Sequence, residues 1–305
     1  MKTTIDYLRF RSQATPSEAL QALKPMFGTL GPSMRLKGLE RGSMGFQQAA
    51  QIVVGDMSVA RLDYGGESQR GWVRAEISGK GCEWVQDWDA AESIELLPSS
   101  QIRRLDIALT TWDGQVTHEK VVGAHQSGRF QTGGRPPDLQ QITSSNDRAG
   151  RTCYVGKRTS DKFFRAYEKG FEMVAKMRSC PGVVTHIDGK RIEDIYRCEV
   201  ELKAGGSDIG WDVIERRDQY FAGSYPFCAD VLPGVEADIL QRRPERAAQS
   251  DLAIALENCR IQFGPTLFTA LTAYHGDMGA VWDKVIGKTH NQALLEAGVL
   301  LVDHD

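Results

Sequence analysis

Residues 148–170 read RAGRTCYVGKRTSDKFFRAYEKG, and this segment decides how the rest of the chain is interpreted. Seven of its side chains are positive and two are negative, whereas the whole chain of 305 residues has a formal net charge of −3. This local imbalance predicts an anionic ligand. A phosphodiester backbone suits a basic run of this length, because each Lys or Arg that neutralises a phosphate releases condensed counterions. The alternative is a solvated charged face of a helix, which has the same composition.

The segments on either side of this basic run alternate between apolar and charged residues, as strands do. Residues 102–114 place branched apolar side chains on one face and Asp106 on the other. Residues 195–205 alternate most clearly, and Glu199 and Glu201 share one face. Asp106 stands out, because a carboxylate within an apolar strand is disfavoured unless it is paired, hydrogen-bonded or bound to a metal.

The predicted fold class is α+β. Strand signals extend to about residue 205 and predict mixed, largely antiparallel sheet. From Trp211 onward, apolar residues recur every three or four positions and predict helices. We therefore expect a sheet-based region over residues 1–205 and a helical C-terminal region over residues 206–305. Residues 123–150 are rich in Gly, Pro, Ser and Gln and predict a long, mobile connection. No internal sequence repeat is evident.

The composition is that of a soluble globular protein, with 41% hydrophobic and 25% charged residues. No apolar run reaches the roughly 20 residues that span a bilayer, and no apolar segment follows the N-terminal lysine as in a signal peptide. We therefore expect a cytoplasmic protein with no membrane contact. The six cysteines form no CxxC pair and have no His at zinc-ligand spacing, which argues against a structural zinc site and a disulfide framework.

Three carboxylates form the predicted metal site. Glu199 and Glu201 lie about 7 Å apart if they face the same way on a strand. With Asp106 from a neighbouring strand they can converge on one hard cation, and all-oxygen ligation suits Mg²⁺ or Mn²⁺. Such an ion polarises a phosphoryl oxygen and positions the scissile phosphate. The alternatives are a Glu-x-Glu pair that faces solvent and an Asp106 that is satisfied by Arg104.

Tyr167 is the candidate nucleophile. Attack by its phenol oxygen forms a phosphodiester, which conserves the energy of the broken bond. Arg165 and Lys169 flank it in sequence, and we expect them to stabilise developing charge or to lower the pKa of the phenol. Tyr154 is the other tyrosine of the basic segment. The alternative is a tyrosine that serves only packing or a hydrogen bond in a basic helix.

Three motifs occur in one order along the chain: RLDIAL at residues 104–109, YVGKRTSDKFFRAYEKG at 154–170 and RCEVELK at 197–203. This order resembles the Rep_trans family of rolling-circle replication initiators, which small plasmids and filamentous phages carry. In that family an Arg-x-Asp strand, a Tyr-x-Gly-x-Arg-x-Ser motif running into Arg-x-Tyr-x-Lys, and a Glu-x-Glu strand recur. The resemblance covers residues 45–205, and the C-terminal hundred residues resemble the family only loosely.

The resemblance implies a DNA nicking and joining enzyme whose catalytic region is residues 1–205. The nucleophile of the family falls on Tyr167, with Arg165 and Lys169 beside it, and the metal carboxylates fall on the three acids named above. Many relatives carry a second acid four residues beyond Asp106, where this sequence has Thr110. The metal set therefore stays open. One possible set of metal ligands is Asp106 with one of the two glutamates, and the other glutamate then serves as a base.

The resulting hypothesis is an initiator that nicks one strand at a phage or plasmid origin and becomes linked to the 5′ phosphate. Its partner is double-stranded origin DNA with a melted or cruciform nick site, together with a host helicase and polymerase in a bacterial cytoplasm. The family also implies two related sheet lobes and a homodimer. The alternatives are a non-catalytic origin-binding regulator and a relaxase of a conjugative element. Four basic side chains are the candidate phosphate contacts: Arg151, Lys157, Arg158 and Lys162.

Overall fold

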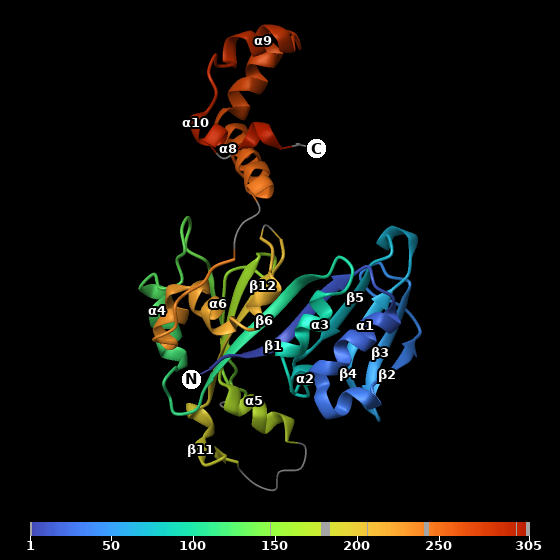
Figure 1. The fold of residues 1–305 in the computed structure, drawn as a ribbon. Coiled ribbons are helices and arrows are strands. Elements are labelled where there is room, and N and C mark those ends of the chain that lie inside the picture. Colours follow the sequence, from blue (N-terminus) through green and yellow to red (C-terminus); the bar gives the residue numbers. More distant parts are fainter. Residues whose placement is uncertain are drawn as a thin grey trace. The chain divides into compact units, whose positions relative to one another are not determined.

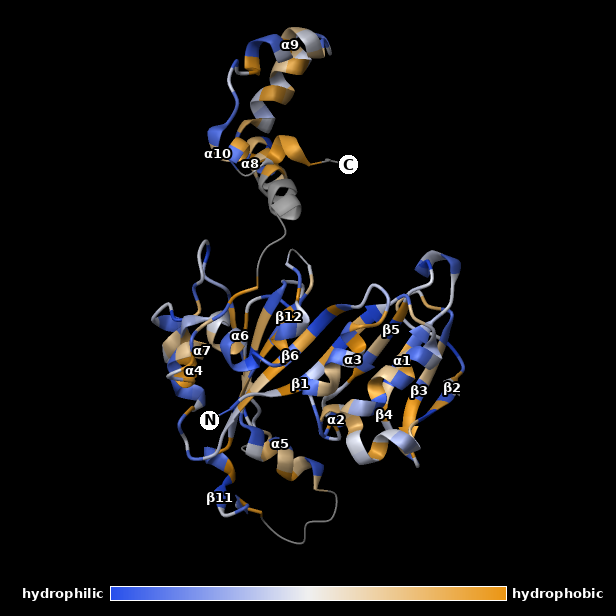
Figure 2. Cartoon of the chain, viewed as in Figure 1, coloured by the Kyte–Doolittle hydropathy of each residue, from blue (hydrophilic) through white to orange (hydrophobic). Residues whose placement is uncertain are grey.

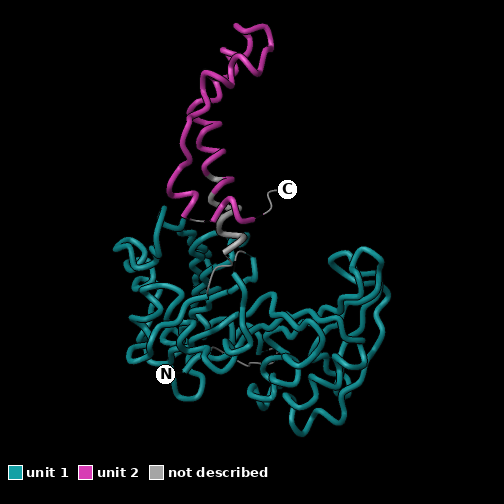
Figure 3. The backbone as a smooth tube through the Cα atoms, turned by 45° about the horizontal axis from the view of Figure 1, so that its top comes forward, with its two compact units in different colours: residues 1–240 teal, residues 241–305 magenta. Residues whose placement is uncertain are grey.

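The structure is a computed structural model that describes residues 2–146, 148–177, 184–205, 207–240, 244–296 and 298–302. The chain divides into two compact units, residues 1–240 and residues 241–305 (Figure 3). The first unit contains the sheet and all the residues of the predicted site. The second unit is helical. The two units are described separately below.

The first unit is built on a sheet of ten strands in the order β2-β3-β4-β5-β1-β6-β12-β9-β8-β7 (Figure 1). Every neighbouring pair in it is antiparallel. The strands are β1 (Thr4–Ser12), β2 (Arg35–Leu39), β3 (Gln48–Val54), β4 (Met57–Tyr64), β5 (Val73–Ile77), β6 (Gln101–Thr111), β7 (Leu139–Ile142), β8 (Thr152–Val155), β9 (Lys162–Tyr167) and β12 (Tyr196–Lys203). A separate hairpin joins β10 (His186–Ile187) to β11 (Lys190–Arg191). The prediction of an α+β fold with a largely antiparallel sheet is confirmed.

The helices of this unit are mostly short. They are α1 (Pro16–Leu23), α2 (Gly79–Cys82), α3 (Glu92–Glu95), α4 (His118–Gln126), α5 (Lys169–Lys176), α6 (Arg217–Ser224) and α7 (Pro226–Val231). The sequence explains where the first one begins. Thr15 accepts a hydrogen bond from the Glu18 amide, and the Glu18 carboxylate accepts one from the Thr15 amide, which is the reciprocal pattern of a capping box. Pro16 then occupies the first helical turn, where its missing N–H costs nothing.

The sheet consists of two halves with the same topology, although the sequence shows no repeat. The first lobe runs β1-α1-β2-β3-β4-β5, and β5 returns to pair with β1. The second lobe runs β6-α4-β7-β8-β9-β12, and β12 returns to pair with β6. Because β1 and β6 pair antiparallel at the centre, an approximate twofold relation connects the lobes. The two related lobes that the family resemblance implies are thus visible in the strand order.

One face of the sheet carries the hydrophobic core. Alternate residues of the central strands, such as Leu105, Ile107 and Val200, are fully buried against the helices on this face. The other face, which we call the polar face, carries Asp106, Arg165 of β9 and the charged residues of β12. The strands accordingly alternate between hydrophobic and hydrophilic residues (Figure 2). The predicted division of faces in the strands around Asp106 and Glu199 is correct.

The strands end close to the expected boundary, whereas the compact unit continues beyond it. β12 ends at Lys203, and the described segments that follow are helical or irregular up to residue 240. Helices α6 and α7 pack on the core face through Phe221 and Phe227, so they belong to the sheet-based unit. The expected mobile connection at residues 123–150 contains the end of α4 and the whole of β7.

The second unit consists of α8 (Pro244–Ala273), α9 (Met278–Val285), α10 (Gln292–Glu296) and a short turn of helix at Val299–Leu301. Several of its large apolar side chains are exposed, among them Phe268 and Trp282. Among the described residues of the whole chain, we find no helix with the length and apolar character to span a membrane.

A close backbone contact fixes the start of α5, the helix that follows the candidate nucleophile. A Cβ atom at Gly170 would lie 2.1 Å from the carbonyl oxygen of Ile192, which is too close for any side chain. The Gly170 amide also donates a hydrogen bond to the carbonyl of Ile195. Glycine at this position therefore lets α5 lie directly against the segment that leads into β12.

We predict that Gly170→Ala displaces the first turn of α5 and destabilises the first unit by about 1–3 kcal/mol, as overpacking of a tight contact does. Urea unfolding followed by circular dichroism measures this. Gly38→Ala is the matched control, because a Cβ there meets no atom within 4 Å. Equal stability of the two variants would contradict the proposed role of the contact.

Candidate functional site

Tyr167 is the last residue of β9, and its side chain lies on the polar face. The segment is a strand rather than the basic helix considered as the alternative. In the β9–β12 ladder, Arg165 is opposite Glu199 and Tyr167 is opposite Arg197. Residues opposite each other share a face, so this register brings the tyrosine beside a carboxylate. The Tyr167 hydroxyl donates a hydrogen bond of 2.7 Å to Glu199 Oε1.

Glu199 is 3% exposed and is held by two neighbours. Its second oxygen, Oε2, accepts a hydrogen bond of 2.8 Å from Arg165 Nε and a second one from the same guanidinium. Its first oxygen accepts the Tyr167 proton. The buried carboxylate is therefore paired and hydrogen-bonded on both oxygens, as a charge at this depth requires.

Asp106 and Glu201 form a second acidic pair on the adjoining strands, where they lie opposite each other in the β6–β12 ladder. Arg104 binds Asp106 with two hydrogen bonds of 2.8 and 2.7 Å. The same Arg104 nitrogen, Nη2, lies 2.7 Å from Glu201 Oε2. Two carboxylates thus converge on one cationic nitrogen. The expected pairing of Asp106 by Arg104 is present.

A cavity of about 20 Å³ connects these acids. It is lined by Arg104, Asp106, Arg158, Phe163, Arg165, Glu199 and Glu201. A volume of this size holds about one water molecule. Among the described residues, no group of three or more His, Cys, Asp and Glu side chains is arranged as a metal site. The three predicted metal carboxylates therefore line one cavity but have different hydrogen-bond and ion-pair partners. Glu199 binds the tyrosine, whereas Asp106 and Glu201 share Arg104.

Burial raises the pKa values of Tyr167 and Asp106. The pKa of Tyr167 is raised, first by burial and then by the nearby Glu199 carboxylate. The expectation that Arg165 and Lys169 lower the pKa of this phenol is therefore wrong, because desolvation and Glu199 outweigh them. Burial also raises the pKa of Asp106 to about 6, although Arg104 opposes the shift. Tyr167 is consequently a neutral phenol near pH 7 and needs a base to react.

Thr110 stands where many family members have an acid, and its neighbours explain how the site accommodates it. The Thr110 hydroxyl accepts a hydrogen bond of 2.9 Å from Arg197 Nε. Another nitrogen of Arg197 lies 3.0 Å from the carboxylate of Asp6. Asp6 reaches the polar face at a register shift in β1 between Ile5 and Tyr7. A carboxylate from β1 thus stands near the position that lacks one on β6.

An open cleft gives access to Tyr167 from the side away from the core. Its volume is about 280 Å³, and its lining includes Tyr167, Arg165, Lys169, Lys80 and Lys176. Lys169 Nζ lies 3.5 Å from the Tyr167 hydroxyl. Lysines from α2 and α5 therefore line this cleft, together with the acids Asp6, Glu83 and Glu172. We call this opening the Tyr167 cleft.

The four predicted phosphate contacts are placed differently. Arg158 lies over the rings of Tyr154 and Phe163, at 4.9 and 5.1 Å from their centres, and lines the small acidic cavity. Lys157 is exposed in the turn before it. Lys162 points to the core face instead, where its amine donates to the Ser224 carbonyl. The structure therefore does not bring Lys162 to Tyr167.

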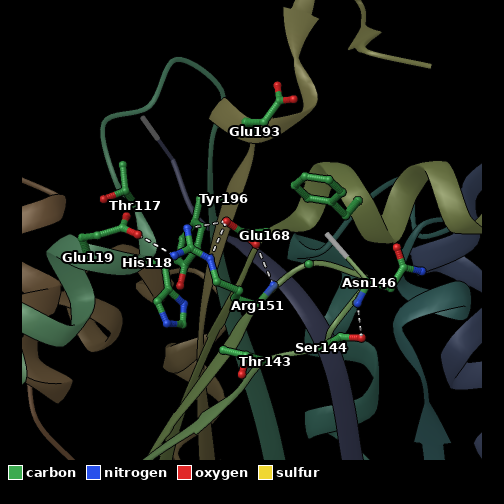
Figure 4. Close-up of a pocket in the computed structure, with 12 residues that line it drawn as sticks. Thr117, His118, Glu119, Thr143, Ser144, Asn146, Arg151, Glu168, Glu193 and Tyr196 are labelled. Atoms are coloured by element: carbon green, nitrogen blue, oxygen red, sulfur yellow. Dashed lines mark hydrogen bonds and ion pairs between the residues drawn. The ribbon is translucent and has the colours of Figure 1, made fainter. Parts of the chain in front are cut away.

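Arg151 lies in a different cavity, which has a volume of about 360 Å³. Figure 4 shows Arg151 between two carboxylates of this cavity, and the guanidinium contacts Glu168 at 2.8 Å and Glu119 at 2.5 Å. The hydrogen bonds that Arg151 donates to Glu168 and Glu119 raise the pKa of Arg151. Because its charge is already neutralised, we leave Arg151 out of the proposed phosphate contacts.

The sequence alone did not single out several groups of this site. Arg197 carried a usable signal, since it lies two residues before Glu199 on the same face of the strand. No sequence signal pointed to Asp6, Lys80 or Glu172. Their proximity to Tyr167 depends on a strand bulge and on the packing of short helices.

Comparison with known proteins identifies the family of part of this unit. The model of the Rep_trans family, described as a replication initiation factor, matches residues 100–247. This region is a member of the Rep_trans family. The Rep_trans region contains the second lobe, and with it Tyr167, Glu199, Asp106 and Glu201. The resemblance inferred from the three motifs is thereby confirmed.

A solved structure shows the same fold. It is the rolling-circle replication initiator protein from Geobacillus stearothermophilus, with a TM-score of 0.55 and 19% sequence identity. The similarity covers 79% of this chain and 99% of that chain. At this identity the likeness establishes the fold, which extends beyond the Rep_trans region. No curated protein matches the chain.

The position of Lys169 depends on Glu172, which gives a testable pH dependence. Burial alone would raise the pKa of Glu172, but hydrogen bonds from Lys169 and Lys176 outweigh it and lower the pKa from 4.5 to about 2. The folded-state pKa lies below the unfolded value, so this stabilisation is present above pH 4.5 and is lost as the pH falls through about 2.

We predict that Glu172→Gln lowers the free energy of unfolding at pH 7 by about 1 kcal/mol or less, since the pair is partly exposed. The difference from wild type should shrink as the pH is lowered from 5 toward 2. Urea unfolding at several pH values measures it. A difference that stays constant over this range would show that the ion pairs of Glu172 contribute nothing.

Proposed function

We propose that this protein nicks and rejoins one strand of DNA at a replication origin and thereby starts rolling-circle replication. The observation that carries the proposal is the hydrogen bond between the Tyr167 hydroxyl and the buried Glu199, at the floor of a cleft lined by lysines. Membership of the Rep_trans region in a family of replication initiation factors supports replication as the process. The fold shared with a rolling-circle initiator supports the type of replication.

The proposed reaction begins with attack of the Tyr167 oxygen on the scissile phosphorus. Glu199 takes the phenol proton as the new oxygen–phosphorus bond forms, because Tyr167 is neutral near pH 7. The bond from phosphorus to the 3′ oxygen breaks, and this oxygen leaves as a 3′ hydroxyl after gaining a proton. The 5′ phosphate stays linked to Tyr167. Arg165 and Lys169 are placed to stabilise the negative charge that develops on the phosphate.

The covalent link makes the reaction reversible. A phosphotyrosine diester replaces a DNA phosphodiester, so the energy for rejoining is conserved in the intermediate. A host polymerase extends the free 3′ hydroxyl, and a later attack by a 3′ hydroxyl on the phosphotyrosine releases a closed circle and restores the Tyr167 phenol. A host helicase is the expected partner that unwinds the displaced strand.

Asp106 and Glu201 are the residues that we propose to hold a divalent cation. Their oxygens already converge on the positive Arg104 nitrogen, and carboxylates are the ligands that Mg²⁺ and Mn²⁺ prefer. When bound, such an ion supplies polarisation of a phosphoryl oxygen. Glu199 is the remaining glutamate, and its contact with the Tyr167 hydroxyl supports a role in proton transfer.

The substrate must be unpaired at the nick. A phosphate inside a duplex cannot reach a tyrosine at the end of a sheet strand, so a melted or cruciform origin is expected. Arg158 and Lys157 are the proposed phosphate contacts next to the acidic cavity. A phage or plasmid in a bacterial cytoplasm, and a homodimer of the initiator, complete the proposal.

We predict that Tyr167→Phe abolishes the covalent protein–DNA adduct while leaving the fold intact. Tyr154→Phe is the matched control, since Tyr154 lies on the same face opposite Arg165 and is not bonded to Glu199. The substrate is a supercoiled plasmid that carries the protein's own replicon, and mass spectrometry identifies the linked residue. An adduct with Tyr167→Phe would remove Tyr167 from the role. Specific binding by wild type without any cleavage would indicate an origin-binding regulator.

We also predict that the three acids separate into two classes. Asp106→Asn and Glu201→Gln should weaken Mn²⁺ binding, measured by electron paramagnetic resonance. Glu199→Gln should bind Mn²⁺ nearly as wild type does but form the adduct about 10²–10⁴-fold more slowly, as loss of a general base does. A Glu199→Gln protein with normal adduct kinetics and weak Mn²⁺ binding would reverse this assignment.

A further inference from the structure

We propose that the polar face of the first lobe is a track for single-stranded DNA that leads away from the nick site. The inference rests on the proposed function for the source of the strand. It goes beyond that function because it assigns a binding role to β1–β5, most of which lies outside the chemistry described above. The track begins at Arg104, which contacts both Asp106 and Glu201.

The strand register places a continuous row of polar side chains across seven strands of the sheet. Each residue of this row is opposite the next in the ladder, so all share the polar face: Lys37, Gln51, Arg61, Glu76, Arg9, Arg104 and Lys203. Neighbouring strands lie about 4.8 Å apart, so the row spans about 30 Å. This length accommodates several nucleotides, which is the range of single-strand sites on sheet surfaces.

The charge of this face is strongly positive, although the chain as a whole is slightly acidic. Three carboxylates of the first lobe lie on it, Asp6, Asp63 and Glu76, and all three are ion-paired. Six positive side chains of the same lobe lie on it: Arg9, Arg11, Arg35, Lys37, Arg61 and Arg74. Within the described part of the chain, Arg9, Arg35 and Lys37 form no ion pair.

Positive residues also stand directly opposite each other at the centre of this face. In the ladders of β1, Arg9 is opposite Arg104 and Arg11 is opposite Arg74. Like charges directly opposite on neighbouring strands are destabilising. Arg74 and Arg104 are each bound by two carboxylates, so the positive charge that remains for a ligand comes mainly from the residues without an ion pair among the described residues, such as Arg9. The arrangement therefore points to a polyanion.

Aromatic side chains lie beside the basic row. The Arg11 guanidinium is 4.1 Å from the ring centre of Trp72, and that of Arg104 is 4.3 Å from the ring centre of Tyr7. Both rings are partly exposed. Positive grooves with interspersed aromatic rings are the pattern by which proteins bind single strands, because every base has a face that stacks.

The repeated topology explains why this lobe would bind without cutting. In the first lobe, Arg61 is opposite Glu76 just as Arg165 is opposite Glu199 in the second. The residue at the register position of Tyr167 is Asp63, which is fully buried. Asp63 accepts hydrogen bonds from Ser43, Arg61 and Arg74 and lacks a nucleophilic hydroxyl. The first lobe keeps the arginines of the pattern and has no counterpart of the nucleophile.

The test is fluorescence anisotropy with the full chain and a labelled oligothymidylate of about 30 nucleotides, over a range of salt concentrations. The variant is Arg9→Ala with Lys37→Ala. Loss of two phosphate contacts should reduce the slope of log K against log salt by about 1.4 and weaken binding on the order of tenfold near 0.1 M salt. Arg9→Lys with Lys37→Arg should keep the wild-type slope, because it keeps both charges.

The matched control removes two positive charges from helical segments that pack on the core side, in Lys24→Ala with Lys120→Ala. Equal slopes for this control and the Arg9–Lys37 variant would overturn the proposal. So would a loss that is confined to a duplex probe of the same length. Urea unfolding of each variant shows whether the fold is retained, and the charge-keeping variant decides the case if the alanine variant does not fold.

The experiment separates this inference from the proposed function. Tyr167→Phe should bind the oligothymidylate as wild type does, because the track does not include the phenol. If wild type forms no covalent adduct with origin DNA but shows the predicted slopes, the nicking proposal fails and the track stands. If the adduct forms and the Arg9–Lys37 alanine variant has the same salt slope as its control, the proposed track is contradicted and the nicking proposal is not.

Discussion

The hydrogen-bond register of β6, β12 and β9 is the constraint on which the site depends. Partners in register share a face, so Glu201 stands beside Asp106 and Glu199 stands beside Arg165. A slip of one residue would turn the side chains of a whole strand to the opposite face. The apolar partners on the core face, fully buried against the helices, hold this register in place. The packing of the core thereby sets the position of the tyrosine relative to its acid.

Each buried acid of the site is matched by a guanidinium. Glu199 is bound by Arg165, and Asp106 and Glu201 are bound by Arg104. A buried carboxylate without such a partner would be costly, and one with a partner can stay charged near neutral pH. The carboxylates and guanidiniums of the site thus balance one another in charge. In the proposed function, DNA binding replaces some of these contacts between side chains by contacts to phosphate.

The sequence predicted the features that depend on local pattern. Alternation around Asp106 and Glu199 was enough to assign their face, and motif order was enough to find the family. The twofold repetition of topology was expected from the family resemblance alone and gave no internal sequence repeat, because the lobes share strand order and not residues. The strand bulge that brings Asp6 to Arg197 gave no sequence signal either. The raised pKa of Tyr167 depends on burial and on a carboxylate 32 positions along the chain, so its neighbours in sequence gave the wrong direction.

The place of the tyrosine at the very end of its strand has a mechanical consequence. Tyr167 closes β9, and α5 starts two residues later with its backbone against Ile192. In the proposed reaction a DNA end is esterified to Tyr167, so a pull on that end would act at the junction between β9 and α5. The load would pass along β9 into the ten-stranded sheet, and the contact of Gly170 with the Ile192 backbone would hold the start of α5 in place. The attachment point would therefore stay fixed while the attached strand is unwound.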